Sequence, residues 1–401
     1  MLFIFLSIKL LIFSIISNKL IGNNTLKSYV KFDFFLLLAG ILLQQVHPMY
    51  TSWIFALIII RDFQHRKMYA FANFYTLMAI LIFILFSYNG YTNGNLTVHN
   101  AIWSSLPSIL GVIIGHNFSL KVNDSNSIYL LLFFFALFLA LPHLTITLQD
   151  IMKSGLINPQ RGLSIYGYDE IQRAITARTV EMSLSISGIS ALFLRKSKAP
   201  AKLTTLFIIV AVLAELCTIH FVSRTGLTLF LLALAIGFLY RTRSTKQILL
   251  YLCLFIVLYY AFQESSLSSL FADREIEGST ISDAGGRLEK WILAFTLLLS
   301  HPHGYSAQFY AHNFWLDFGK VGGLLSFFIL SLYSLLLLVK TIMLQKVSKI
   351  VFYNRFMILV FSITFIAALF TEPVHRGAPA YMYMYFLFAG YVDGLSKLYK
   401  R

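Results

Sequence analysis

The sequence predicts an all-α, polytopic integral membrane protein with about 12–13 transmembrane helices. Of its 401 residues, 58% are hydrophobic and only 12% are charged, and the mean hydropathy is +0.74. Soluble domains carry about 25% charged residues. Apolar runs near the ~20 residues needed to cross hydrocarbon recur along the whole chain, and they are continuous rather than alternating. Backbone polar groups inside lipid must bond within the segment, so these runs are expected to be helices.

The runs set the order of the expected spans. They lie near residues 2–17, 33–46, 50–61, 71–88, 101–118, 127–147, 178–194, 203–222, 225–240, 247–262, 320–340, 351–370 and 379–396. The second and third are short and separated by His47-Pro48, so they predict either a tight hairpin or one distorted unit. We expect the first run to be a retained helix. A signal peptide is the alternative, but no small-residue cleavage site follows.

The formal charge of +15 is distributed in short basic clusters between the runs, at 61–67, 195–202, 241–246, 340–349 and 397–401. This is the pattern of cytoplasmic loops, and it argues against a nucleic-acid partner. With these clusters inside, the spans alternate consistently from Asp33 onward, as twelve helices. The expected partner is the lipid bilayer, and the cytoplasmic face is expected to be plain.

Two long segments then fall on the outer, periplasmic side. The first is 147–179 and the main loop is 263–319, within a single integral membrane domain of residues 1–401. Inside the main loop, Leu288–Leu299 is apolar but too short to span, so it predicts a short helix that lies along the interface, with a segment that re-enters the membrane as the alternative. Cys217 and Cys253 lie within apolar runs and are expected to be packing residues.

Arginines on the outer side oppose the topology rule and therefore need a local reason. Guanidinium groups match phosphate oxygens bidentately and keep their charge, so an anionic lipid-linked ligand is one reason. Pairing with nearby acids, as of Arg178 with Glu181, is the alternative. The arginines concerned are Arg161, Arg173, Arg178, Arg224, Arg287 and Arg376.

A second polar group precedes the span near 320–340. His312 is expected at the start of a helix that enters the membrane from outside, where a neutral imidazole can accept a proton from a sugar hydroxyl. Asn313 and Asp317 share one helix face and could bond a polar substrate. The alternative is that Asn313 caps the helix and His312 only hydrogen-bonds at the interface. At the last outer turn, Glu372 is expected to pair with Arg376.

Four motifs occur in order: SRTG at 223–226, GGRLEKW at 285–291, SHPHG at 300–304 and AHNFWLDFGKVGG at 311–323. Together they resemble the O-antigen polymerase and O-antigen ligase superfamily, which are bacterial membrane glycosyltransferases of the GT-C class. The resemblance covers about residues 170–345 by motif and the remainder by hydropathy only.

The resemblance implies transfer of an undecaprenyl-pyrophosphate-linked glycan to an acceptor hydroxyl at the periplasmic face, with inversion and without a metal or cofactor. His312 and Arg287 would be catalytic, and Arg173, Arg178 and Arg224 would bind pyrophosphate. A chain-length regulator and a flippase are the implied partners. The motifs are shared by polymerases and ligases. We expect a polymerase, with the ligase as the alternative, and a flippase or transporter as a rival of another class.

Overall fold

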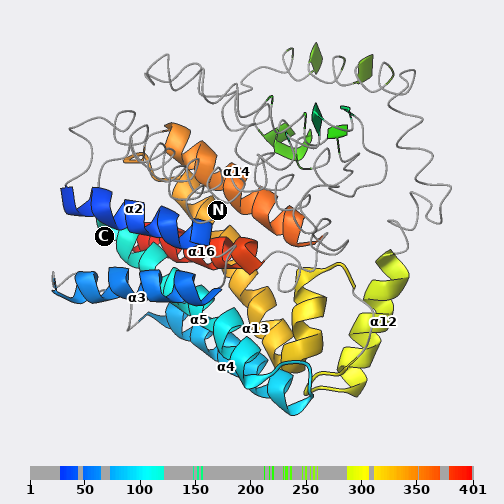
Figure 1. Cartoon of the computed structure of the whole chain (residues 1–401). Helices are drawn as coiled ribbons and strands as arrows, with labels where there is room; N and C mark the ends of the chain where they lie inside the picture. Colours follow the sequence, from blue (N-terminus) through cyan, green and yellow to red (C-terminus); the bar gives the residue numbers. More distant parts are fainter. Residues whose placement is uncertain are drawn as a thin grey trace. The chain divides into compact units, whose positions relative to one another are not determined.

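The protein, seen here as a computed structural model, is all-helical in the elements that the structure describes (Figure 1). It describes residues 28–43, 48–64, 73–121, 287–306, 311–350, 352–370 and 379–399, together with single positions between 148 and 260. The predicted all-α class is therefore confirmed for this part of the chain. The run at 2–17 and most of the runs between 127 and 262 lie outside it.

The described helices follow the predicted apolar runs closely. They are α2 (Ser28–Leu43), α3 (Pro48–Gln64), α4 (Phe74–Thr92), α5 (Val98–Lys121), α12 (Arg287–Ser300), α13 (Phe314–Gln345), α14 (Phe352–Leu369) and α16 (Pro379–Leu398). Among them α4, α5 and α13 are long and apolar enough to cross a membrane. A polytopic membrane protein fits these helices. The predicted total of spans, and the side on which each loop lies, stay predictions.

The chain forms two compact units, one of residues 1–142 and 294–401 and the other of residues 143–293. The described helices belong to the first unit, except for the first half of α12, which belongs to the second. Within the second unit, the ring of His220 lies 3.0 Å from the carbonyl oxygen of Leu156. The predicted single domain and the predicted loop boundaries stay predictions.

Helices α2 and α3 form an antiparallel hairpin, which is one of the two arrangements that the sequence allowed. Thr51 Oγ1 donates to the carbonyl oxygen of Gly40 (2.8 Å), and a Cβ at Gly40 would lie 2.9 Å from the ring of Phe55. At the other end of the pair, Arg61 Nε donates to Asp33 Oδ1 (2.9 Å). The missing side chain of Gly40 therefore lets the two helices approach where they join.

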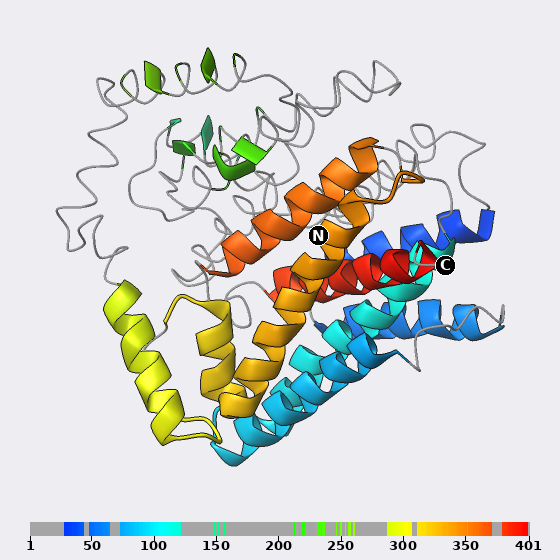
Figure 2. The same ribbon diagram turned by 180° about the vertical axis from the view of Figure 1, so that it is seen from behind.

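Helices α5 and α16 run parallel with their backbones in direct contact (Figures 1 and 2). Each carries two glycines four residues apart, Gly111 and Gly115 on α5 and Gly390 and Gly394 on α16. A Cβ at Gly115 would lie only 1.9 Å from the carbonyl oxygen of Leu387. Small residues at this spacing are the usual means by which apolar helices approach closely without a hydrophobic driving force.

Helix α13 reverses direction at Gly323, which has φ 84° and ψ 173°. Figures 1 and 2 show residues 314–322, here called the short arm, running back alongside residues 324–345, the long arm. In a continuous helix, Trp315 and Ser334 would be about 28 Å apart. Instead Trp315 Nε1 donates to Ser334 Oγ at 3.1 Å. The chain after His312 is therefore a helical hairpin and not the single span that the sequence predicted.

Glycine and a neighbouring loop make this reversal possible. Only glycine adopts the backbone angles of Gly323 without steric cost. A continuous helix would join the N–H of Leu324 to the carbonyl oxygen of Lys320. Both groups find other partners in the segment before the hairpin: Leu324 N donates to Pro302 O (2.8 Å), and Tyr305 N donates to Lys320 O (2.9 Å). The break therefore leaves neither of these two backbone groups without a hydrogen-bond partner.

We predict that Gly115→Ala destabilises the protein and that Gly111→Ala does not. The added methyl group at position 115 would overlap the Leu387 carbonyl, and such overpacking costs about 1–3 kcal/mol. At position 111 the nearest atom, the carbonyl oxygen of Tyr383, is 3.3 Å away, and alanine favours the helix. Thermal unfolding of the purified variants in detergent measures the difference. Equal melting temperatures would contradict the close α5–α16 contact.

Candidate functional site

The residues before the short arm form a tight turn around one carboxyl group, here called the His312 turn (residues 311–313). The carboxyl oxygens of Asp317 accept hydrogen bonds from the backbone N–H groups of Ala311 (2.9 Å) and Asn313 (3.2 Å). The N–H of His312 also faces this carboxyl group. The side chain of Asn313 caps the helix by accepting from Leu316 N (3.2 Å). Asn313 therefore caps the helix, and Asp317 likewise binds the protein's own backbone.

His312 is held in a backbone conformation that is unusual for its residue type. Its φ is +52°, and it is the only non-glycine residue with positive φ in the part of the chain that the structure describes. A non-glycine residue in such a region costs about 1–3 kcal/mol and persists only where its surroundings enforce it. The hydrogen bonds from the backbone of the turn to the Asp317 carboxyl group hold His312 in this conformation. Because strained residues cluster at functional sites, the observation favours a functional role for His312.

The exposure of the turn agrees with this role. Ala311, Asn313 and Asp317 are buried, whereas His312 is partly exposed. Every residue of the short arm is buried, including Lys320. The backbone of the turn is fixed and His312 is partly exposed, although the Nδ1 atom of its ring is buried. A fixed, partly exposed histidine suits a residue that contacts a ligand.

A chain of hydrogen bonds fixes the short arm against its neighbours. Trp315 Nε1 bonds to Ser334 Oγ, and Ser334 Oγ lies 2.7 Å from the hydroxyl of Tyr385 in α16. Trp315 also contacts Phe370, which follows α14, with 4.6 Å between the ring centroids and 44° between the ring planes. The His312 turn therefore sits at the level of the middle of the long arm, about 13 Å along the short arm from the reversal.

Tyr305 connects the loop at the reversal to helix α12. Its hydroxyl donates to the carbonyl oxygen of Ala294 (3.2 Å). Burial, together with the nearby Asp317 carboxyl group, raises the pKa of Tyr305 to about 12. The phenol therefore keeps its proton and remains a donor at any physiological pH. This bond ties the second half of α12 to the base of the hairpin.

The predicted site residues are distributed unevenly over the structure. His312, Asn313 and Asp317 come together in the turn. Arg287 is the first residue of α12 and is partly exposed, and α12 forms where the sequence predicted an interfacial helix. The remaining predicted residues lie outside the described residues: Arg161, Arg173, Arg178, Arg224, Glu372 and Arg376. The predicted pyrophosphate site and the Glu372–Arg376 pair stay predictions.

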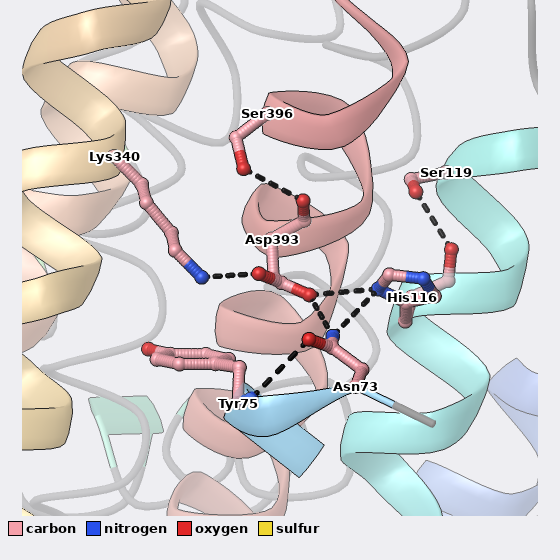
Figure 3. A network of polar contacts seen from close by, with 7 residues as sticks. All are labelled: Asn73, Tyr75, His116, Ser119, Lys340, Asp393 and Ser396. Carbon is pink, nitrogen blue, oxygen red and sulfur yellow. Dashed lines mark hydrogen bonds and ion pairs between the residues drawn. The ribbon is translucent and has the colours of Figure 1, made fainter. Parts of the chain in front are cut away.

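A buried polar network, not predicted from the sequence, joins four helices (Figure 3). At its centre, the carboxylate of Asp393 in α16 accepts from Lys340 Nζ in the long arm of α13 and from Asn73 Nδ2 at the start of α4. His116 Nδ1 in α5 lies 2.8 Å from Asp393 Oδ2 and donates to it when protonated. The Lys340 ammonium also lies 3.9 Å from the centre of the Tyr75 ring.

The Asn73 amide connects this network to helix formation. Its Oδ1 accepts from the N–H of Tyr75 (3.2 Å) and caps α4, so its Nδ2 is the atom directed at Asp393 and His116. One side chain thus begins a helix and bonds a buried carboxylate. The available signals were the single acid in the apolar α16 and a histidine well inside the apolar α5, because ionisable residues within such helices are usually paired and functional.

A second ion-pair cluster joins the end of α5 to α2 and α3. Lys121 Nζ at the end of α5 bonds to Asp62 and, at 3.0 Å, to Asp33 Oδ2, and Asn117 Nδ2 bonds to Asp62 Oδ2 (3.2 Å). His116 and Asn117 are adjacent, so α5 connects the two clusters. We call them together the charged end. The charged end was not predicted from the sequence, and the plain cytoplasmic face stays a prediction.

Among known proteins, no family model matches the chain, and no curated protein matches it. The resemblance to the O-antigen polymerase and ligase superfamily therefore remains a proposal. No group of three or more histidine, cysteine, aspartate or glutamate residues is placed to hold a metal ion in the part of the chain that the structure describes.

We predict that Lys340→Leu destabilises the protein more than the double change Lys340→Leu/Asp393→Leu. Removing Lys340 takes a cation away from the buried Asp393 and leaves its carboxylate with Asn73 and His116. Breaking a buried pair costs up to about 3–5 kcal/mol, whereas replacing both partners by apolar residues is often close to neutral. A double-mutant cycle on thermal stability in detergent measures the coupling. Strictly additive effects of the two single changes would contradict the ion pair.

Proposed function

We propose that the chain is a membrane glycosyltransferase that polymerises undecaprenyl-pyrophosphate-linked oligosaccharide repeat units, as an O-antigen or other surface-polysaccharide polymerase. The observation that carries the proposal is the strained, partly exposed His312 held by Asp317. It lies within the longest of the four motifs that resemble the O-antigen polymerase and ligase superfamily. Strain at this residue supports a role in binding or chemistry rather than in capping alone.

In the proposed reaction, His312 accepts the proton of an acceptor sugar hydroxyl. The hydroxyl oxygen forms a bond to the anomeric carbon of the donor glycan while the bond from that carbon to the pyrophosphate oxygen breaks. The pyrophosphate leaves with the electron pair, and the anomeric configuration inverts. Asp317 and Asn313 do not contact the substrate in this scheme. They hold the backbone so that the imidazole keeps one orientation.

Negative charge develops on the leaving pyrophosphate, and arginine stabilises it through fixed charge and bidentate hydrogen bonds. Arg287 at the start of α12, with Arg173, Arg178 and Arg224, is proposed for this role. The proposed location is the periplasmic face of a bacterial inner membrane. A flippase that supplies the lipid-linked repeats and a regulator of chain length are the proposed partners.

One observation favours a second candidate function, a flippase or other transporter. Discontinuous helices near the middle of a bundle are typical of secondary transporters. Helix α13 breaks at Gly323, and its short arm carries the buried Asp317 and Lys320. A ligase that moves finished polymer to lipid A-core is the alternative within the superfamily.

Deletion of the gene separates these functions by the glycan that accumulates. We expect single repeat units on the lipid A-core, because a polymerase is missing while ligation continues. Polymer retained on undecaprenyl pyrophosphate with a bare core would instead identify a ligase. Lipid-linked repeats confined to the cytoplasmic leaflet would identify a transporter. Gel separation of lipopolysaccharide and extraction of lipid-linked glycan measure the three outcomes.

We also predict that His312→Ala and Arg287→Ala each abolish chain extension without lowering the amount of protein in the membrane. The first change removes the proposed base, and the second removes charge beside the leaving group. His303→Ala and Lys290→Ala are matched controls, because both residues are exposed in neighbouring segments. Glycan of normal length from either site variant would remove that residue from the proposed catalytic set.

A further inference from the structure

Three asparagines at the end of α4 hold the reversal of α13. Asn89 Nδ2 donates to the carbonyl oxygen of Gly322 (2.7 Å). Asn93 Nδ2 donates to His303 O (2.6 Å), and Asn95 Nδ2 donates to Tyr305 O (3.1 Å). We call these three residues the asparagine latch. They come from one short stretch of sequence, and their partners are the last residue of the short arm and two residues of the loop that contacts the reversal.

Asn89 is the member of the latch that acts on α13 directly. Its side chain is buried, with 6% exposure. In a continuous helix, Gly322 O would accept from the N–H of Ser326. At the reversal Asn89 supplies the donor instead, so the last carbonyl of the short arm remains satisfied. A buried carbonyl left without a donor is costly, and loss of the Asn89 amide would therefore weaken the reversal selectively.

The carbonyl groups at the break do not form a cation site. A broken helix in a transporter often uses such oxygens to coordinate sodium. Here Pro302 O, His303 O, Lys320 O and Gly322 O each accept a hydrogen bond from an N–H group. Each of these carbonyl oxygens thus already has a hydrogen-bond donor from the protein. Helix α4 and the loop supply partners at the break.

We propose that Asn89 is a positioning residue for His312, acting through the reversal at Gly323. The inference rests on the proposed function of the His312 turn. The short arm is a nine-residue helix with the turn at one end and the Asn89 contact at the other. A tilt of about 10° at the reversal would move the turn by about 2 Å, given the ~13 Å length of the arm. Displacements of about 1 Å can lower catalysis about a hundredfold.

The reversal can be measured without any activity. A Cβ at Gly319 would lie 2.9 Å from the Cβ of Phe327, across the hairpin. In a continuous helix the same two positions would be about 12 Å apart, too far for a disulfide. The pair Gly319→Cys/Phe327→Cys, in a Cys217→Ser/Cys253→Ser background, is therefore expected to oxidise to an intramolecular disulfide. Protection from a maleimide-linked polymer reports its formation.

The test compares Asn89→Leu with Asn100→Leu in this background. Asn100 is exposed near the start of α5, so the control makes the same chemical change without touching the reversal. We expect Asn89→Leu to slow disulfide formation about tenfold, and Asn89→Gln, which retains an amide donor, to restore part of the rate. Asn100→Leu should leave the rate unchanged. An unchanged rate in Asn89→Leu overturns the proposal.

Glycan length in the same variants, without the engineered cysteines, separates positioning from simple folding. Shorter glycan from Asn89→Leu at normal membrane abundance, partly rescued by Asn89→Gln, supports positioning. A slowed disulfide with normal glycan length overturns it, because the reversal then does not matter for the reaction. If His312→Ala itself gives normal glycan, His312 leaves the proposed catalytic set and Asn89 has no catalytic residue to position, whatever the disulfide rate shows.

Discussion

The reversal of α13 at Gly323 determines where the His312 turn lies. It turns nine residues back along the long arm, buries all of them, and brings the His312 turn level with Ser334. The reversal itself depends on a backbone conformation that only glycine adopts easily and on hydrogen-bond partners from Pro302, Tyr305 and Asn89. Sequence-distant segments thus supply what the broken helix lacks.

At the charged end, buried ion pairs and hydrogen bonds hold the helices together. Close packing of α5 on α16 brings His116 beside Asp393, and the long arm adds Lys340. Buried ion pairs stabilise little relative to apolar residues of the same shape, but they penalise every arrangement that separates the partners. The charged end therefore specifies which helices pair and in which register. The strain at His312 is compatible with folding because the rest of the unit is specified so strongly.

The sequence predicted the helices well and the chemistry only in part. Apolar runs located α2 to α5, α13, α14 and α16, because burial in lipid or protein demands continuous apolar helices. The cap role of Asn313 followed from its position before an apolar run. The reversal did not follow, since 319–323 reads equally as close helix packing. Nor did the Asp393 network, whose members Asn73, His116 and Lys340 are far apart in the chain and meet only through tertiary packing.

The depth of the His312 turn is the physical quantity that distinguishes the two classes of function. The turn lies about 13 Å from the reversal, near the middle of an arm whose 22 residues span about 33 Å. If the long arm crosses the bilayer, His312 lies well inside the hydrocarbon thickness of about 30 Å. A transferase acting on a pyrophosphate at headgroup level must then draw the acceptor sugar into the bundle. In secondary transporters, the substrate-binding site typically lies at this depth, near the middle of the bilayer. A transferase therefore requires a polar path from the His312 turn to the outer membrane surface. A transporter requires polar paths from the turn to both membrane surfaces.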